Sequence, residues 1–121
     1  NAARNLARDA SQLVAGSAKQ YKYLLGQQLL KSATDVCKGV ILAYKEAQFS
    51  QKKLDLLDSV PDALYDFSIN LRMMKDNAAV SYNLYKMCIL QYKSIQKQLA
   101  NWRKYVVKNM DNLNSIESAN S

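Results

Sequence analysis

Hydrophobic and polar residues alternate along this chain at the three- and four-residue spacing of amphipathic α-helices. A short first helix is predicted from Asn1, which can cap it, to a break at Gly16 and Ser17. Its apolar positions are Leu6, Ala10, Leu13 and Val14. A long second helix is predicted from about Ala18 to Phe49. Its inward positions are Leu25, Leu29, Ala33, Val36, Val40, Tyr44 and Ala47.

The outward face of the second helix mixes the two signs of charge, as an ordinary solvated surface does. These residues are Lys31, Asp35, Lys38 and Lys45. Gly26, inside the same segment, costs about 1 kcal/mol relative to alanine in a helix. It indicates either the close approach of a neighbouring helix or a tolerated accident.

A third helix is predicted from an N-cap at Ser50 to about Lys75. Because Pro61 lacks an N–H, either the helix kinks there or Ser59 caps a fresh start, and we expect a kink within one domain. The inward positions are Leu54, Leu57, Leu64, Phe67 and Leu71. The outward face is a row of acids, expected to be solvated rather than to bind a metal: Asp55, Asp58, Asp62 and Asp66.

A fourth helix is predicted to run from an N-cap at Ser81 to about Met110. Its apolar row is Leu84, Cys88, Gln91, Ile95, Leu99, Trp102, Val106 and Leu113. Residues 111–121 form a polar tail that we expect to fray. A single domain is therefore predicted over residues 1–110.

Four amphipathic helices with short connections predict an all-α fold, an antiparallel up-and-down four-helix bundle. One proline and three glycines in 121 residues agree, because β-sandwiches and barrels use these residues at their turns. The short first helix leaves an alternative, an open helical array that completes its core by oligomerising. In either form we expect an oligomer.

The back of the fourth helix is a one-sided row of positive charge. The chain has a net charge of +7, and no acidic residue lies between Asp76 and Asp111. On a helical wheel, a sector of roughly 60° contains Lys86, Lys93, Lys97, Lys104 and Lys108. Such a row can neutralise the phosphates of RNA or DNA without reading base sequence. The alternative is a solvated surface that keeps a basic protein soluble.

Other chemistry has little support in the sequence. There is no histidine, the commonest general base and metal ligand, so we expect no catalytic site, metal or cofactor. Cys37 and Cys88 fall on apolar faces and are expected to be buried free thiols, with a disulfide as the alternative. No apolar run approaches the roughly 18 residues of a membrane span, and no signal segment opens the chain. We expect a cytoplasmic protein without a membrane partner, although a basic amphipathic helix can also lie on a membrane surface.

Several short motifs are similar to a family of small bacterial four-helix proteins. Residues 19–26 (KQYKYLLG) resemble the start of the family's second helix, and Leu71, Arg72 and Ser81 match later positions. Residues 95–104 resemble the closing pattern of isoleucine, glycine, arginine, leucine, two small residues and tryptophan. The departures are Gln96 and Asn101 in place of glycine and Lys97 in place of arginine. The family comprises the accessory variability determinant (Avd) proteins of diversity-generating retroelements and the proteins encoded in ribosomal RNA intervening sequences.

This resemblance implies a basic, non-enzymatic bundle that forms a ring-like homopentamer, binds RNA or DNA and partners a reverse transcriptase. The intervening-sequence relatives imply an alternative, a structural bundle that recognises an acidic protein surface. Arg103, Arg72 and Lys22 join the five lysines as candidate nucleic-acid contacts. Six tyrosines offer stacking faces for unpaired bases or, as is commoner, pack at core edges. They are Tyr21, Tyr23, Tyr82, Tyr85, Tyr92 and Tyr105.

Overall fold

The computed structural model describes residues 2–17, 22–46, 49–77 and 80–120, and these ranges contain four α-helices and no β-strand. The predicted all-α class with four helices is confirmed. Asn1, Ala18 and Ala47, which carried parts of the prediction, lie outside the described residues. The elements are α1 (Ala2–Ala15), the π-helical turn η1 (Lys22–Gly26), α3 (Gln27–Lys45), α4 (Gln51–Asn77) and α5 (Tyr82–Asn120).

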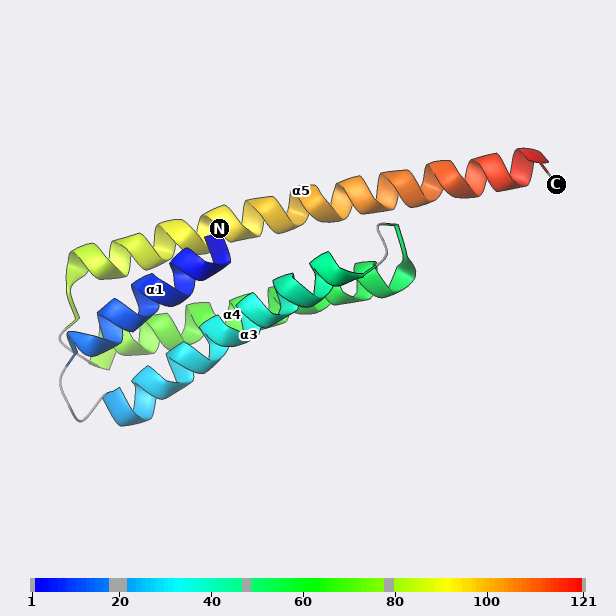
Figure 1. Ribbon diagram of the computed structural model, residues 1–121. Helices are drawn as coiled ribbons and strands as arrows, with labels where there is room; N and C mark the ends of the chain where they lie inside the picture. The colour runs from blue at the N-terminus through cyan, green and yellow to red at the C-terminus, as the bar shows by residue number, and fades with distance from the viewer. Residues whose placement is uncertain (1, 18–21, 47–48, 78–79, 121) are drawn as a thin grey trace.

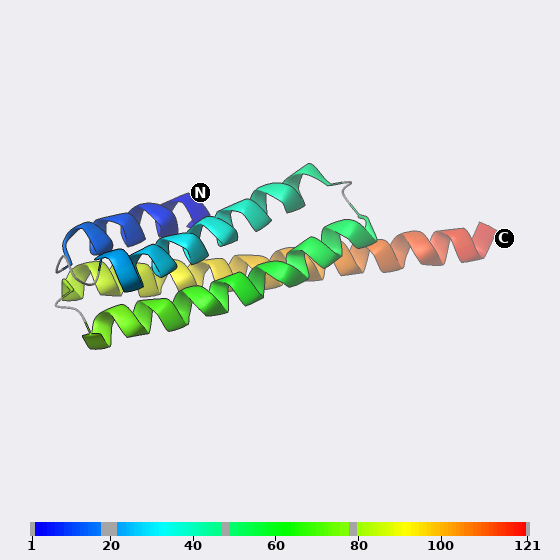
Figure 2. The same cartoon turned by 90° about the horizontal axis from the view of Figure 1, so that it is seen from below.

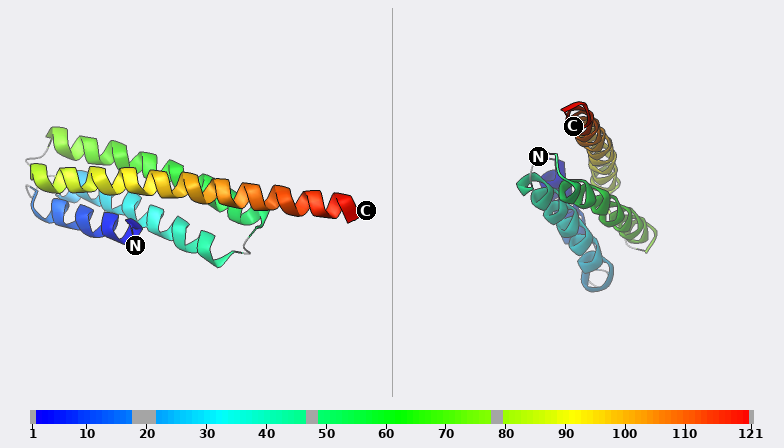
Figure 3. Two further views of the ribbon diagram at one scale, coloured as in Figure 1. Left: turned by 90° about the horizontal axis from the view of Figure 1, so that it is seen from above. Right: turned by 90° about the vertical axis from the view of Figure 1, so that its right-hand side faces the viewer.

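The helices lie along a common axis and form a bundle (Figures 1 and 3). Helix α1 packs on α3 and α5, and α4 packs on the same two helices. The core lies between all four, since each contributes an apolar stripe. The predicted inward residues that are buried include Leu6, Leu13, Leu29, Val36, Leu57, Phe67, Leu71, Cys88, Ile95 and Val106.

Serine side chains begin the two longest helices, as predicted. The Ser50 hydroxyl accepts a hydrogen bond of 3.1 Å from the Lys53 amide, and the Ser81 hydroxyl accepts one of 3.4 Å from the Leu84 amide. Helix α4 runs without a break through Pro61. Ser59 does not cap a new helix, because its hydroxyl donates to the Leu56 carbonyl within α4.

The second helix ends earlier than predicted. Helix α3 stops at Lys45, and Glu46 is extended, with φ of −78° and ψ of 158°. A helix that ended at Phe49 would leave no residues for the chain to reverse before Ser50 begins α4. The predicted end was wrong because it ignored this connection.

The fourth helix runs on past its predicted end at Met110 and continues to Asn120. No glycine or proline follows Pro61 to stop it, and asparagine and serine each cost a helix less than about 1 kcal/mol. Leu113, predicted in the apolar row, is 46% exposed. The C-terminal part of α5 projects past the other helices (Figure 2).

Gly39 marks a close helix contact in the described part of the chain. A Cβ atom added at Gly39 would lie 2.7 Å from Cγ2 of Val60, so the missing side chain lets α3 approach α4. Val60 is only 1% exposed, and valine in a helix has one strongly preferred rotamer. The methyl group therefore has no easy way to move aside.

We predict that Gly39→Ala destabilises the protein. The gain of about 1 kcal/mol in helix propensity is outweighed by overpacking, which costs about 1–3 kcal/mol. In a Val60→Ala background the same Gly39→Ala change should stabilise, because the obstructing methyl groups are gone. Urea unfolding of the four proteins measures both effects, and the same sign in both backgrounds would contradict the contact.

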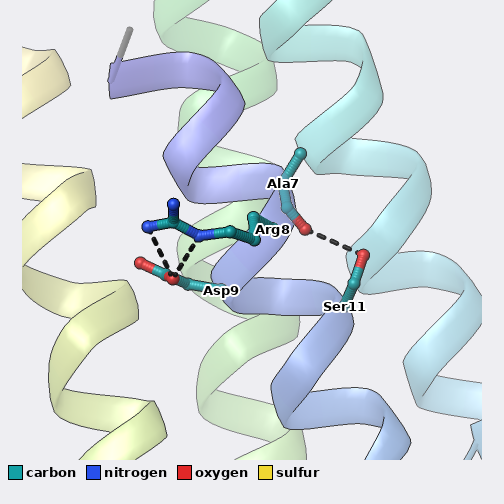
Figure 4. Close-up of polar contacts among 4 residues, drawn as sticks. All are labelled: Ala7, Arg8, Asp9 and Ser11. Atoms are coloured by element: carbon teal, nitrogen blue, oxygen red, sulfur yellow. Dashed lines mark hydrogen bonds and ion pairs between the residues drawn. The ribbon is translucent and has the colours of Figure 1, made fainter.

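Asp9 is a charged residue in the core of the bundle. Its side chain is 0% exposed, and its Oδ1 lies 3.4 Å from Nε of Arg8, whose side chain is 59% exposed (Figure 4). Its Oδ2 has no hydrogen-bond partner in the described structure. Nearby Ser11 does not reach it, since that hydroxyl donates to the Ala7 carbonyl at 2.9 Å. Nη2 of Arg8 also donates to the same Oδ1 at 3.5 Å. A carboxylate held only by two long contacts from one exposed arginine opposes the docking of α1.

We predict that Asp9→Leu raises the free energy of unfolding by about 1–3 kcal/mol, because an apolar side chain removes the buried, half-satisfied charge. Urea denaturation provides the measurement. The matched control is Asp62→Leu on the exposed face of α4, which should change stability by less than about 0.5 kcal/mol. A loss of stability in Asp9→Leu would show that the carboxylate has a stabilising partner.

Candidate nucleic-acid interface

The five lysines of the predicted row all belong to α5 and are exposed; we call them the lysine stripe. The stripe comprises Lys86, Lys93, Lys97, Lys104 and Lys108. From first to last it spans about 33 Å along one helix, at about 1.5 Å per residue. The stripe faces away from the core because Cys88, Ile95, Leu99 and Val106 are buried on the other side of α5.

None of the stripe lysines forms an ion pair in the described part of the chain. Ion pairs there involve Arg8, Lys52 and Arg103. Two stripe pairs, Lys93 with Lys97 and Lys104 with Lys108, are four residues apart and repel each other by about 0.2–0.5 kcal/mol per pair. The stripe therefore works against the stability of its own helix.

Arg103 differs from the stripe. Its Nε donates to Oδ1 of Asp58 on α4 at 2.6 Å, and both side chains are about half exposed. The hydrogen bond and the charge of Asp58 raise the pKa of the Arg103 guanidinium. Its charge is thus matched by a carboxylate of the same chain, so it contributes to the α4–α5 contact. Sequence reasoning placed Asp58 on a solvated face and missed this partner.

The other two candidate cations are not brought into the stripe. Arg72 is exposed on α4, a different helix. Lys22 begins η1, and its side chain lies outside the described part of the structure. The acidic residues of α4 are exposed as predicted, and Asp55 accepts a hydrogen bond of 2.8 Å from Gln51. No cluster of three potential metal ligands occurs among the described residues.

The tyrosines divide between the two roles considered for them. Tyr82 and Tyr105 are 70% and 54% exposed. Tyr85 and Tyr92 are half-buried, and Nζ of Lys75 lies 4.9 Å from the Tyr85 ring centroid. The side chains of Tyr21 and Tyr23 lie outside the described structure. Exposed tyrosines therefore occur at both ends of the stripe.

Sequence reasoning missed an aromatic cluster around Trp102. Tyr44 was predicted to be in the core, but it is 68% exposed and its ring centroid lies 4.6 Å from that of Trp102. Nζ of Lys53 lies 5.1 Å from the Trp102 ring, and Lys53 is only 6% exposed. The sequence did contain a signal that Lys53 lies on the buried face of its helix. Lys53 precedes the buried Leu57 and Val60 by four and seven residues, which is the spacing of one helix face.

Both cysteines are free, as predicted. Cys88 is buried, and burial together with the charge of Asp9 raises the pKa of its thiol to about 12. Cys37 is half-buried, and desolvation raises the pKa of its thiol, which donates to the Ala3 carbonyl at 3.1 Å. Neither thiol is therefore a reactive thiolate at neutral pH.

Comparison with protein-family models, with curated proteins and with solved structures gives no significant match to this chain. The resemblance to Avd and intervening-sequence proteins therefore stays a prediction. Among the described residues, no helix combines the length and the apolar character needed to cross a bilayer.

We predict that Lys93→Glu combined with Lys104→Glu stabilises α5. Each change replaces a repelling pair by a Glu–Lys pair in the favourable i,i+4 order, for a total gain of about 1–2 kcal/mol at low salt. Thermal unfolding measures it. The control is Lys97→Glu with Lys108→Glu, which has the same composition. Its pairs have the less favourable Lys–Glu order, so it should gain less stability. Equal or lower stability than the parent protein would contradict the view that the stripe is uncompensated.

Proposed function

We propose that this protein is a non-enzymatic nucleic-acid-binding protein and that the lysine stripe of α5 is its contact surface. The observation that carries the proposal is the set of five exposed lysines without carboxylate partners on the outward face of one helix. Each phosphate that a lysine neutralises releases condensed counterions, which supplies the free energy of binding. An anionic ligand best explains why one helix keeps lysines that repel each other and have no carboxylate partners.

The binding depends on the phosphate backbone and not on base sequence. Lysine is a flexible point charge that cannot read base edges in the bidentate manner of arginine. The stripe's length of about 33 Å corresponds to about ten base-pair steps of a duplex, at 3.4 Å each. Five contacts along that length predict a logarithmic salt dependence with a slope of about −4.5 on duplex DNA.

The family resemblance extends this proposal to the protein's setting. It places the chain as an accessory of a retroelement reverse transcriptase in the cytoplasm, acting on RNA or DNA as an antiparallel, up-and-down bundle in a homo-oligomer. The resemblance to Avd proteins in particular implies a homopentamer. The support in this chain is the combination of a basic face with four helices. The motif residue Ser81 caps α5, and the motif residue Trp102 packs against the core.

A second candidate is a protein-interaction bundle of the intervening-sequence type that binds an acidic protein surface. An ammonium group also pairs with a carboxylate, as Lys52 does with Glu46 at 3.2 Å, so the stripe is also suited to an acidic protein surface. The two candidates differ in the ligand that must be present and in the steepness of the salt dependence.

We predict that changing Lys93, Lys97 and Lys104 together to glutamate abolishes binding to duplex DNA and to RNA while the helix content stays unchanged. The three side chains are exposed, so their replacement does not disturb the core. Electrophoretic mobility shifts at two salt concentrations measure affinity, and circular dichroism measures helix content.

The matched control changes Lys31, Lys38 and Lys45 to glutamate. These lysines are also exposed, on α3, and the change in net charge is the same. The control should retain the stripe's steep salt dependence with a modest loss of affinity. Equal losses in the two triple variants would assign binding to net charge alone, and unchanged affinity in the α5 variant would refute the site.

A further inference from the structure

A groove of about 390 Å³ lies between α4 and α5, which pack side by side (Figure 3); we call it the α4–α5 groove. Its floor is apolar, since Leu57, Leu64 and Leu99 are buried. Two aromatic side chains line it, Tyr65 of α4, which is 62% exposed, and Tyr92 of α5, which is half-buried. Ligand pockets commonly have volumes of about 300–1,000 Å³ and apolar, aromatic linings. The groove is therefore suited to a flat aromatic group.

Hydrogen bonds hold the polar side chains that line the groove. Nε2 of Gln96 donates to the Tyr92 hydroxyl at 2.9 Å, so one wall is fixed within α5. Nε of Arg103 donates to Oδ1 of Asp58 at 2.6 Å and ties α5 to α4. Walls that are already in place lower the entropy cost of binding a ligand between them.

The groove opens beside the lysine stripe. Its residue Ala100 lies three residues after Lys97 and four before Lys104, and helix residues at these spacings have Cβ atoms about 5–6 Å apart. Gln96 has the same three-residue spacing from Lys93. Because Ala100 is exposed and carries only a methyl group, it does not obstruct the path from the stripe into the groove. A nucleotide whose phosphate lies on the stripe can therefore place its base in the groove.

Positive charge also occurs on the α4 side of the groove. Arg103 meets Asp58 at one level of the two helices. At another level, Nζ of Lys75 lies 4.9 Å from the Tyr85 ring centroid. Between these levels lies the exposed Arg72 of α4, next to the beginning of the stripe on α5. A strand that lies along the groove therefore meets cations from both helices, which is complementary to its phosphates.

We propose that the α4–α5 groove binds an unpaired base of a single strand of RNA or DNA whose phosphates lie on the lysine stripe. This inference rests on the proposed function and names the form of nucleic acid that the site prefers. The bases of a duplex are paired and stacked inside it, so only a single strand can place one in the groove. Tyr65 and Tyr92 stack on the face that every base presents, so the contact is tolerant of sequence.

The test compares a short oligothymidine strand with a strand of the same length in which every base is absent. Both carry the same phosphates, so the stripe binds both and only a base-binding site distinguishes them. The parent protein should bind the strand with bases about 5- to 100-fold more tightly, as stacking of one base on an aromatic side chain predicts. Fluorescence anisotropy measures the two affinities, and equal values would overturn the proposal.

Tyr65→Ala should weaken binding of the strand with bases by the same factor and leave the affinity for duplex DNA unchanged. Its salt dependence on a single strand should keep the parent's slope of about −3.5 for five phosphate contacts. Tyr65→Phe keeps the ring and should bind like the parent. The matched control is Tyr44→Ala, which removes a tyrosine of α3 that is 68% exposed and outside the groove. It should bind every probe like the parent.

Ala100→Leu tests the groove without removing an aromatic ring. The larger side chain narrows the opening beside the stripe, so it should weaken binding of the strand with bases but not of duplex DNA. Circular dichroism checks that each variant keeps its helix content. The proposal is overturned if both groove variants keep the parent's preference for bases, or if Tyr44→Ala loses that preference equally. Failure of the stripe is seen separately, as unchanged duplex affinity in the triple variant of Lys93, Lys97 and Lys104, and it would overturn both proposals.

Discussion

The structure depends on the burial of one side of α5 against α1 and α4. Cys88, Ile95, Leu99 and Val106 are between 0% and 7% exposed and recur at helical spacing. Each fully buried aliphatic side chain contributes about 1.5–3 kcal/mol, so this seam fixes the rotation of the helix about its axis. With that rotation fixed, the residues on the opposite side must face water. The lysine stripe is exposed for this reason.

Local sequence was sufficient to predict the helices, their serine caps and most of the core. A hydroxyl at Ser50 or Ser81 and an apolar residue every three or four positions act within one helix, so they can be recognised without knowing its neighbours. The exposure of the stripe follows from the same periodicity. The helix ends were predicted less accurately. Where a chain reverses, and where a helix continues alone, depends on the position of the neighbouring helices, which local sequence does not give.

Contacts between helices could not be predicted in this way. Arg103 meets Asp58 across 45 positions of sequence, and Gly39 accommodates Val60 only because α3 and α4 align at that level. Periodicity gives the face on which a residue lies but not its height along the bundle relative to other helices. The pairing of Tyr44 with Trp102 was missed for the same reason, since it requires knowing the height of α3 along the bundle relative to α5.

The residues that build the core and the residues proposed to bind nucleic acid lie on opposite sides of α5. The stripe and the line through Trp102 and Leu113 are roughly 160° apart around the helix axis. Burial of the side that carries Trp102 therefore leaves the stripe free to contact a polyanion. In the proposed homo-oligomer, linked stripes would bind a polyanion by successive intramolecular contacts, so a row of five lysines that is weak in one chain would gain avidity. Phosphate contacts alone give modest affinity, and assembly would supply what a single helix lacks.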